Sequence, residues 1–196
     1  MPQTNAPDLP AVLATWHHLG QVYGTRVIDK ARSPLMRAVA LFLAAIRIQP
    51  SRMFLTEFTT TIGHRIYLPH DLNAACGSEE AFQRLVLGVH EHQHVVQWQR
   101  GPVRFVLSYL LSPTARARHE AEAYACALDL AAWTGRPLPS PESMAQRLAH
   151  YGCGPAAIAV AADLLRTAEA KARAGGCTAS ASEVAIAFLE SRQALG

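Results

Sequence analysis

The chain has 196 residues, of which 50% are hydrophobic and 17% are charged, and it carries a formal net charge of +3. This length suits one domain with a substantial core, and the composition excludes an intrinsically disordered chain. The arginines are scattered, with no basic run and no basic residues interleaved with aromatic ones, so nothing predicts a nucleic-acid partner.

Three features bear on where the protein resides. The longest apolar stretch, residues 39–46, is far too short to span a membrane. The first residues contain no basic segment followed by an apolar one, as a secretory signal would require. The four cysteines are widely spaced without a C-x-x-C pair, which is typical of thiols in a reducing compartment, although two disulfides stay possible. We therefore expect a cytoplasmic protein without a membrane span.

The first predicted elements are a helix and a β segment. A helix should follow Ser33-Pro34, because a hydroxyl that can cap it precedes Pro at the first helical position. Residues 58–62 and 64–68 are rich in Thr, Ile, Tyr and Phe, and Gly63 separates them, which predicts a hairpin or a bulged strand. Its edge could bind an extended peptide by main-chain pairing, or the hairpin could be an ordinary internal one.

A long helix is predicted from Ser78 to Arg100. Ser78 is the expected N-cap residue, and the two glutamates after it would lie in the positive first turn. Apolar residues then recur at intervals of three and four until a Gly-Pro pair at 101–102. The segment is too long for an ordinary strand.

This helix contains an H-E-x-x-H string at residues 90–94. His90 and His94 lie one turn apart on a helix, so their imidazoles can bind one metal ion, and Glu91 beside them can transfer a proton. On a strand, His90, His92 and His94 would instead share one face and form a three-histidine site. Length and periodicity favour the helix.

Further helices are predicted downstream. Ser-Pro pairs at 112–113 and 140–141 each begin one, and the first of these should reach about residue 133. A Gly-Pro pair at 154–155 begins an Ala- and Leu-rich helix that ends near residue 174, before two glycines. The last helix, residues 181–194, is preceded by a capping-box pattern in Ser180 and Glu183.

A third metal ligand is expected from the helix that begins after residue 112. Catalytic zinc sites commonly use three protein ligands, two His and one Glu being a standard set, and leave a fourth position for water. Glu120 lies 26 residues after His94 and could complete that set. Glu122 competes with it, but the two side chains lie roughly 200° apart around a helix, so only one can face the metal.

The string His90-Glu91-x-x-His94, followed by Glu120-Ala-Glu-Ala-Tyr, resembles the gluzincin branch of the zinc metallopeptidases over about residues 56–130. In relatives such as the CAAX prenyl proteases and the membrane heat-shock proteases, the first Glu of E-x-x-A-D binds the metal. The resemblance therefore implies Glu120 as the ligand here and Glu122 as a surface charge.

Tyr124 stands where those relatives have Asp, and two roles stay open for it: a hydrogen bond to the site or oxyanion, or packing between helices. The continuation to Gln97 also resembles small bacterial peptidases of the H-E-x-x-H-x-x-Q kind. A metzincin would need Gly at position 97 and His at position 100, where this chain has Gln97 and Arg100.

The other polar and aromatic side chains near the motif are given ordinary roles. We expect that His92 and Gln93 fill free positions of the motif, that His119 faces solvent or the core edge, and that Trp98 belongs to the core. His64 and His70 could stabilise an oxyanion, but a lone His in a loop is usually polar surface.

These features predict a single α+β domain over residues 1–196, mainly helical and zincin-like, with a small sheet or hairpin beside the active-site helix. The resemblance implies zinc-dependent peptide-bond hydrolysis, with Zn²⁺ held by His90, His94 and Glu120, Glu91 as general base and a peptide or protein as substrate. Two alternatives stay open: a non-peptidase metal hydrolase, and an inactive zinc-stabilised binding or regulatory domain. Glu91 counts against the second, because a purely structural site needs no base.

Overall fold

The computed structural model describes residues 7–45 and 51–194. It is mostly helical and contains a small three-stranded mixed sheet, as expected for the predicted α+β class. In chain order the elements are α1 (Leu9–Tyr23), β1 (Arg26–Asp29), α2 (Pro34–Ala45), α3 (Ser51–Glu57), β2 (Thr60–Ile62), β3 (Arg65–Leu68), α4 (Ser78–Arg100), α5 (Pro102–Leu111), α6 (Pro113–Trp133), α7 (Pro141–Gln146), a 3-10 turn (Arg147–Tyr151), α8 (Pro155–Arg173) and α9 (Ser180–Gln193).

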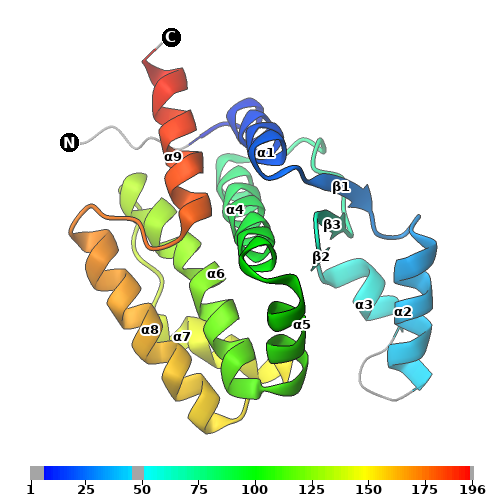
Figure 1. Cartoon of the computed structure of the whole chain (residues 1–196). Helices are drawn as coiled ribbons and strands as arrows, with labels where there is room; N and C mark the ends of the chain where they lie inside the picture. The colour runs from blue at the N-terminus through cyan, green and yellow to red at the C-terminus, as the bar shows by residue number, and fades with distance from the viewer. Residues whose placement is uncertain (1–6, 46–50, 195–196) are drawn as a thin grey trace.

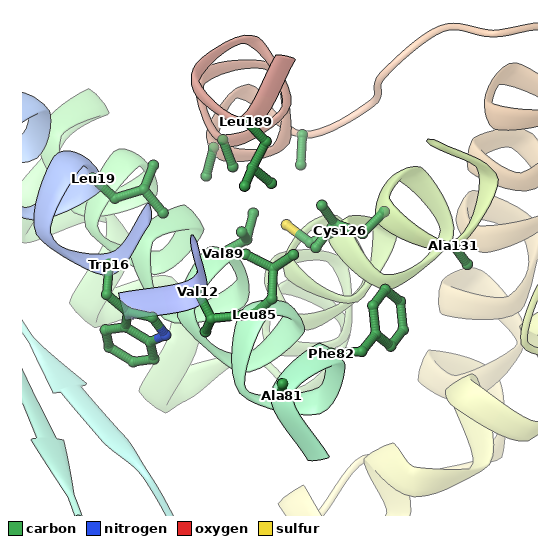
Figure 2. Packing of buried hydrophobic residues seen from close by; sticks show 14 of the residues in the cluster. Val12, Trp16, Leu19, Ala81, Phe82, Leu85, Val89, Cys126, Ala131 and Leu189 are labelled. Carbon is green, nitrogen blue, oxygen red and sulfur yellow. The ribbon is translucent and has the colours of Figure 1, made fainter. Parts of the chain in front are cut away.

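Helix α4 occupies the middle of the molecule, with the sheet, α2 and α3 on one side and α6, α7 and α8 on the other (Figure 1). One core cluster joins α4 to α1, α6, α9 and β3. Figure 2 shows Trp16 of α1, Leu85 and Val89 of α4, Cys126 of α6 and Leu189 of α9 within this cluster. Because its apolar side chains are buried among those of four other elements, α4 is held in place, and so is the H-E-x-x-H string that it carries.

A second core cluster lies between α6, α7 and α8, and small side chains dominate it. Ala121 and Ala125 of α6 and Ala161 and Ala168 of α8 are all buried there. Such small residues let two helix backbones approach closely, and α6 and α8 form the most extensive contact between any two described elements. Helix α6 is therefore fixed from both sides, between α4 and α8.

The sheet has the order β1-β3-β2, in which β1 is parallel to β3 and β2 is antiparallel to it. The β2–β3 pair confirms the predicted hairpin, and Gly63 takes the positive φ of 60° that its turn requires. Strand β2 lies at the sheet edge and contacts α4. This contact places an edge strand beside the H-E-x-x-H string.

The predicted helices are confirmed, and so are three of their caps. Each Ser side chain at 33, 112 and 140 accepts a hydrogen bond from the backbone N–H three residues later. Two predicted caps are wrong. Ser78 is the first helical residue of α4, whose N-cap is Gly77 without a side-chain hydrogen bond. Ser180 is likewise the first residue of α9, so it forms no capping box with Glu183.

The caps of α9 come from distant side chains instead. The carboxylate of Asp129 on α6 accepts from the N–H groups of Thr178 and Ala179, and Gln93 of α4 accepts from the N–H of Ala181. Sequence reasoning considered local residues only, whereas these partners are 49 to 88 positions away. Helices α1, α3 and α5 and strand β1 were not predicted. The four-residue β1 is defined by its parallel pairing with β3, a non-local contact.

Candidate metal centre

His90 and His94 project from one face of α4, as the H-E-x-x-H spacing predicts. Their Nε2 atoms are 3.2 Å apart. Helix α6 brings Glu120 opposite them, with Oε2 3.8 Å from Nε2 of His90 and Oε1 3.6 Å from Nε2 of His94. Glu120 is 1% exposed, and the three side chains form a buried group that could hold a metal ion.

Two observations show that this group suits a metal ion. Ligand atoms bound 2.0–2.1 Å from a tetrahedral zinc lie ~3.3 Å from one another, and the two Nε2 atoms, 3.2 Å apart, match that spacing. The two oxygens of Glu120 lie slightly farther away, with Oε1 3.6 Å from His94 and Oε2 3.8 Å from His90. In addition, Oε2 of Glu120 is buried and accepts no hydrogen bond within the described part of the chain. A buried carboxylate oxygen without a partner is costly, and a cation between it and the two imidazoles would satisfy it.

Gln97 sets the tautomer of His94. Its Nε2 donates to the carbonyl of His119 and to Glu122, so its Oε1 is the atom that faces Nδ1 of His94, at 2.9 Å. Nδ1 must then carry the proton, which leaves the Nε2 lone pair free for a metal. Burial lowers the pKa of His90 well below its ordinary value, although the backbone of Ala123 opposes that shift. His94 is therefore oriented by Gln97 with its Nε2 available to a metal, and burial favours the neutral form of His90.

Tyr109 is a site residue that sequence reasoning missed. Its hydroxyl, on α5, donates to Oε1 of Glu120 at 2.6 Å. This bond fixes the carboxylate and leaves Oε2 as its free oxygen. No sequence motif indicates a role for Tyr109. Its contact with Glu120 depends on the direction that α5 takes after the break between α4 and α5 at Gly101.

Glu91 lies outside the group of possible ligands, at the wall of the same site. It is 5% exposed, and its Oε2 accepts a 2.6 Å hydrogen bond from the Thr61 hydroxyl of the edge strand β2. Burial raises the pKa of the Glu91 carboxyl, while nearby His94 and the Thr61 bond oppose that rise. A buried carboxylate with a raised pKa and a fixed orientation is suited to accept and return a proton.

A cavity of about 470 Å³ opens onto these residues. Its walls include the three possible ligands, Glu91, the whole of β2, and the aromatic side chains Phe54, Phe58, Trp98, Phe105, Tyr109 and Tyr151. Trp98 thus lines the cavity, which corrects its expected core position. His150 also reaches this wall, although its distance from the motif in sequence gave no sign of it.

The two carboxylates of α6 point in different directions. Glu120 faces the histidines, and Glu122 accepts hydrogen bonds from Gln93, Gln97 and Arg100 of α4. The expected surface role of Glu122 is therefore wrong, because the close α4–α6 packing places it beside the polar end of α4. Gln93, expected to have no special role, is fully buried between this carboxylate and the N-terminus of α9.

His92 faces away from the possible ligands, which excludes the strand-type three-histidine site. It is fully buried, and its two ring nitrogens bond the Thr25 hydroxyl and the Gly88 carbonyl. His119 is half-buried against the Ser108 hydroxyl, as expected for a residue at the core edge. His64 and His70 are exposed, and neither lines the cavity.

Tyr124 packs against the possible metal ligands, and no hydrogen bond joins it to them among the described residues. Its ring centroid is 5.1 Å from that of His90, and the side chain is half-buried. Burial raises the pKa of its hydroxyl, which interacts with the hydroxyl of Tyr151. Of the two roles left open for Tyr124, packing is the one observed.

Comparisons with protein-family models, with curated proteins and with solved structures found no match. Among the described residues, no helix combines the length and the apolar character that a membrane crossing requires.

Proposed function

We propose that this protein is a zinc-dependent peptidase in which His90, His94 and Glu120 bind the ion and Glu91 is the general base. The observation that carries the proposal is the pairing of two buried carboxylates with different partners. Glu120 turns its free Oε2 toward His90 and its Oε1, held by Tyr109, toward His94, whereas Glu91 lies beside them and is held by Thr61. Bound zinc would lower the pKa of a coordinated water and polarise the scissile carbonyl.

The chain's own residues would then handle the proton. Glu91 accepts it from the attacking water and returns it to the leaving amine, and its raised pKa brings it closer to the working range of such a base. Thr61 keeps the Glu91 carboxylate turned toward the cavity through its 2.6 Å bond. A purely structural zinc site has no use for a second buried carboxylate held in this way.

The cavity supports a peptide with apolar side chains as the substrate. Among the described residues that line it there is no Lys or Arg side chain to bind a substrate's terminal carboxylate, and its aromatic walls suit large uncharged side chains. Strand β2 lies at the sheet edge along this cavity, where an extended peptide can pair with its main chain. We therefore propose cleavage at internal bonds flanked by apolar residues.

The test of the metal group compares matched variants. Elemental analysis should find one zinc per parent chain and strongly reduced zinc in His94→Ala and Glu120→Gln. Glu122→Gln is the matched control on the same helix. It should keep stoichiometric zinc because Glu122 is not one of the possible ligands and Gln97 keeps its bond to the His119 carbonyl. Full zinc in both ligand variants would refute the ligand assignment.

The test of the enzyme activity uses Glu91→Gln and a mixed peptide library. A general base contributes about a hundredfold to ten-thousandfold in rate, so this variant should keep zinc and fold while losing cleavage. Cleavage by the parent chain that Glu91→Gln abolishes would support the peptidase. If both proteins bind zinc and neither cuts any peptide, a zinc-stabilised binding domain becomes the better account.

A further inference from the structure

A second cavity, of about 340 Å³, lies where α4 ends and α5 begins, against the first half of α6. Figure 1 shows these three helix segments converging below the centre of the molecule. Four basic side chains and one carboxylate line the cavity: Arg100, Arg104, Arg118, His119 and Glu122. Phe105 lines both this cavity and the 470 Å³ cavity beside the possible metal ligands.

The charges of this second cavity are unbalanced. Arg100 pairs with Glu122 at 2.5 Å, whereas Arg104 and Arg118 form no ion pair within the described residues. Three guanidinium groups against one carboxylate leave two positive charges in one concave site. Arginine side chains are planar forks of N–H donors that match the oxygens of phosphates and carboxylates.

The backbone adds N–H donors that also attract anions. Helix α5 begins at this cavity, and its N-cap, Gly101, offers no side chain to its first-turn N–H groups. Those of Val103 and Arg104 have no intrahelical partner, and the helix dipole makes this end attractive to anions. The helix end alone would not define a site, but here it opens into a cavity that already carries unpaired arginines.

We propose that this second cavity binds a phosphate group. The two unpaired positive charges match a phosphate dianion better than a single carboxylate, and the cavity is large enough for a phosphate or a small phosphorylated molecule. Glu122 is the group that competes with the anion, because it already occupies Arg100. This proposal does not depend on the peptidase assignment.

The position of the cavity links it to the metal centre. Glu122 accepts from Gln97, and Gln97 in turn accepts from the ring of His94. An anion that draws Arg100 away from Glu122 would therefore act on the side chain that orients a possible metal ligand. The link runs through three consecutive contacts of 2.5, 3.0 and 2.9 Å.

Isothermal titration of the full chain with inorganic phosphate tests the site, with acetate at the same ionic strength as the comparison. Phosphate should bind saturably and more tightly than acetate. Arg104→Ala and Arg118→Ala should each weaken phosphate binding about tenfold, as expected for the loss of a charge-assisted contact. Arg192→Ala on α9, which lies outside this cavity, is the matched control and should leave the affinity unchanged.

Glu122→Gln should change the phosphate affinity in the opposite direction, because it frees Arg100 and removes the competing carboxylate. Its phosphate affinity should rise above that of the parent chain. Phosphate could also bind to a metal ion held by His90, His94 and Glu120. The two arginine variants do not change those ligands, so a loss of phosphate affinity in these variants assigns the binding to the second cavity. A parent chain without saturable binding, or equal affinities in Arg104→Ala, Arg118→Ala and Arg192→Ala, would overturn the proposal.

Discussion

Gly88 lies in the middle of α4, two residues before the first histidine of the motif, and we expect that its replacement by Ala destabilises the protein. A Cβ at Gly88 would stand 2.5 Å from Nε1 of Trp16, well inside the 3.0 Å that real Cβ atoms respect. Trp16 is 4% exposed, and its Nε1 donates to the Arg84 carbonyl at 3.0 Å. The ring also packs edge-on against His92. The indole therefore has no free direction in which to move.

Opposing contributions decide the sign for Gly88→Ala. Replacing a mid-helix Gly by Ala stabilises a helix by about 1 kcal/mol. Overpacking a well-filled core costs about 1–3 kcal/mol, and loss of the indole hydrogen bond costs about 0.5–1.5 kcal/mol more. The packing and hydrogen-bond losses exceed the gain in propensity. We expect a net decrease of about 2 kcal/mol in the free energy of unfolding.

Denaturant unfolding of four proteins measures this effect: the parent chain, Gly88→Ala, Trp16→Leu and the double variant. Leu occupies less space than the indole, so Gly88→Ala should cost much less in the Trp16→Leu background, and the cycle isolates the coupling between the two side chains. If Gly88→Ala stabilises the parent chain, or lowers its stability equally in both backgrounds, the steric argument fails.

Three further changes give directional results. Gln97→Leu removes the acceptor that fixes the His94 tautomer, so zinc affinity measured by chelator competition should fall about 10- to 100-fold with the fold retained. Asp129→Ala leaves the N–H groups of Thr178 and Ala179 without their acceptor, the second of them buried, and chemical denaturation should show a loss of about 1–3 kcal/mol. Burial lowers the pKa of Lys30 to about 8 from 10.5, so the unfolded chain binds more protons between these values. The free energy of unfolding should therefore rise with pH from about 8 to 10.5, and this rise should be smaller in Lys30→Met.

The sequence predicted the helices that carry the chemistry because their signals are local. Ser-Pro pairs, a glycine at the end of a periodic segment, and apolar residues at intervals of three and four are all features of neighbouring residues. The same holds for His90 and His94, since one turn of a helix suffices to bring them together. The capping predictions at Ser78 and Ser180 failed for the converse reason. The groups that satisfy the start of α9 belong to α4 and α6, far away in the chain.

The possible metal ligands likewise depend partly on local sequence and partly on contacts between distant segments. The chain itself determined two imidazoles on one helix face, a carboxylate beside them, and a choice between Glu120 and Glu122 on a later helix. The tertiary structure decided that choice, because the packing of α6 between α4 and α8 fixes which side of α6 turns inward. It alone placed Tyr109 on Glu120 and Thr61 on Glu91, since these contacts join elements whose separation in sequence says nothing of their distance in space. The periodicity of apolar residues indicates which face of a helix or strand is buried, whereas only the tertiary packing determines which residues that face contacts.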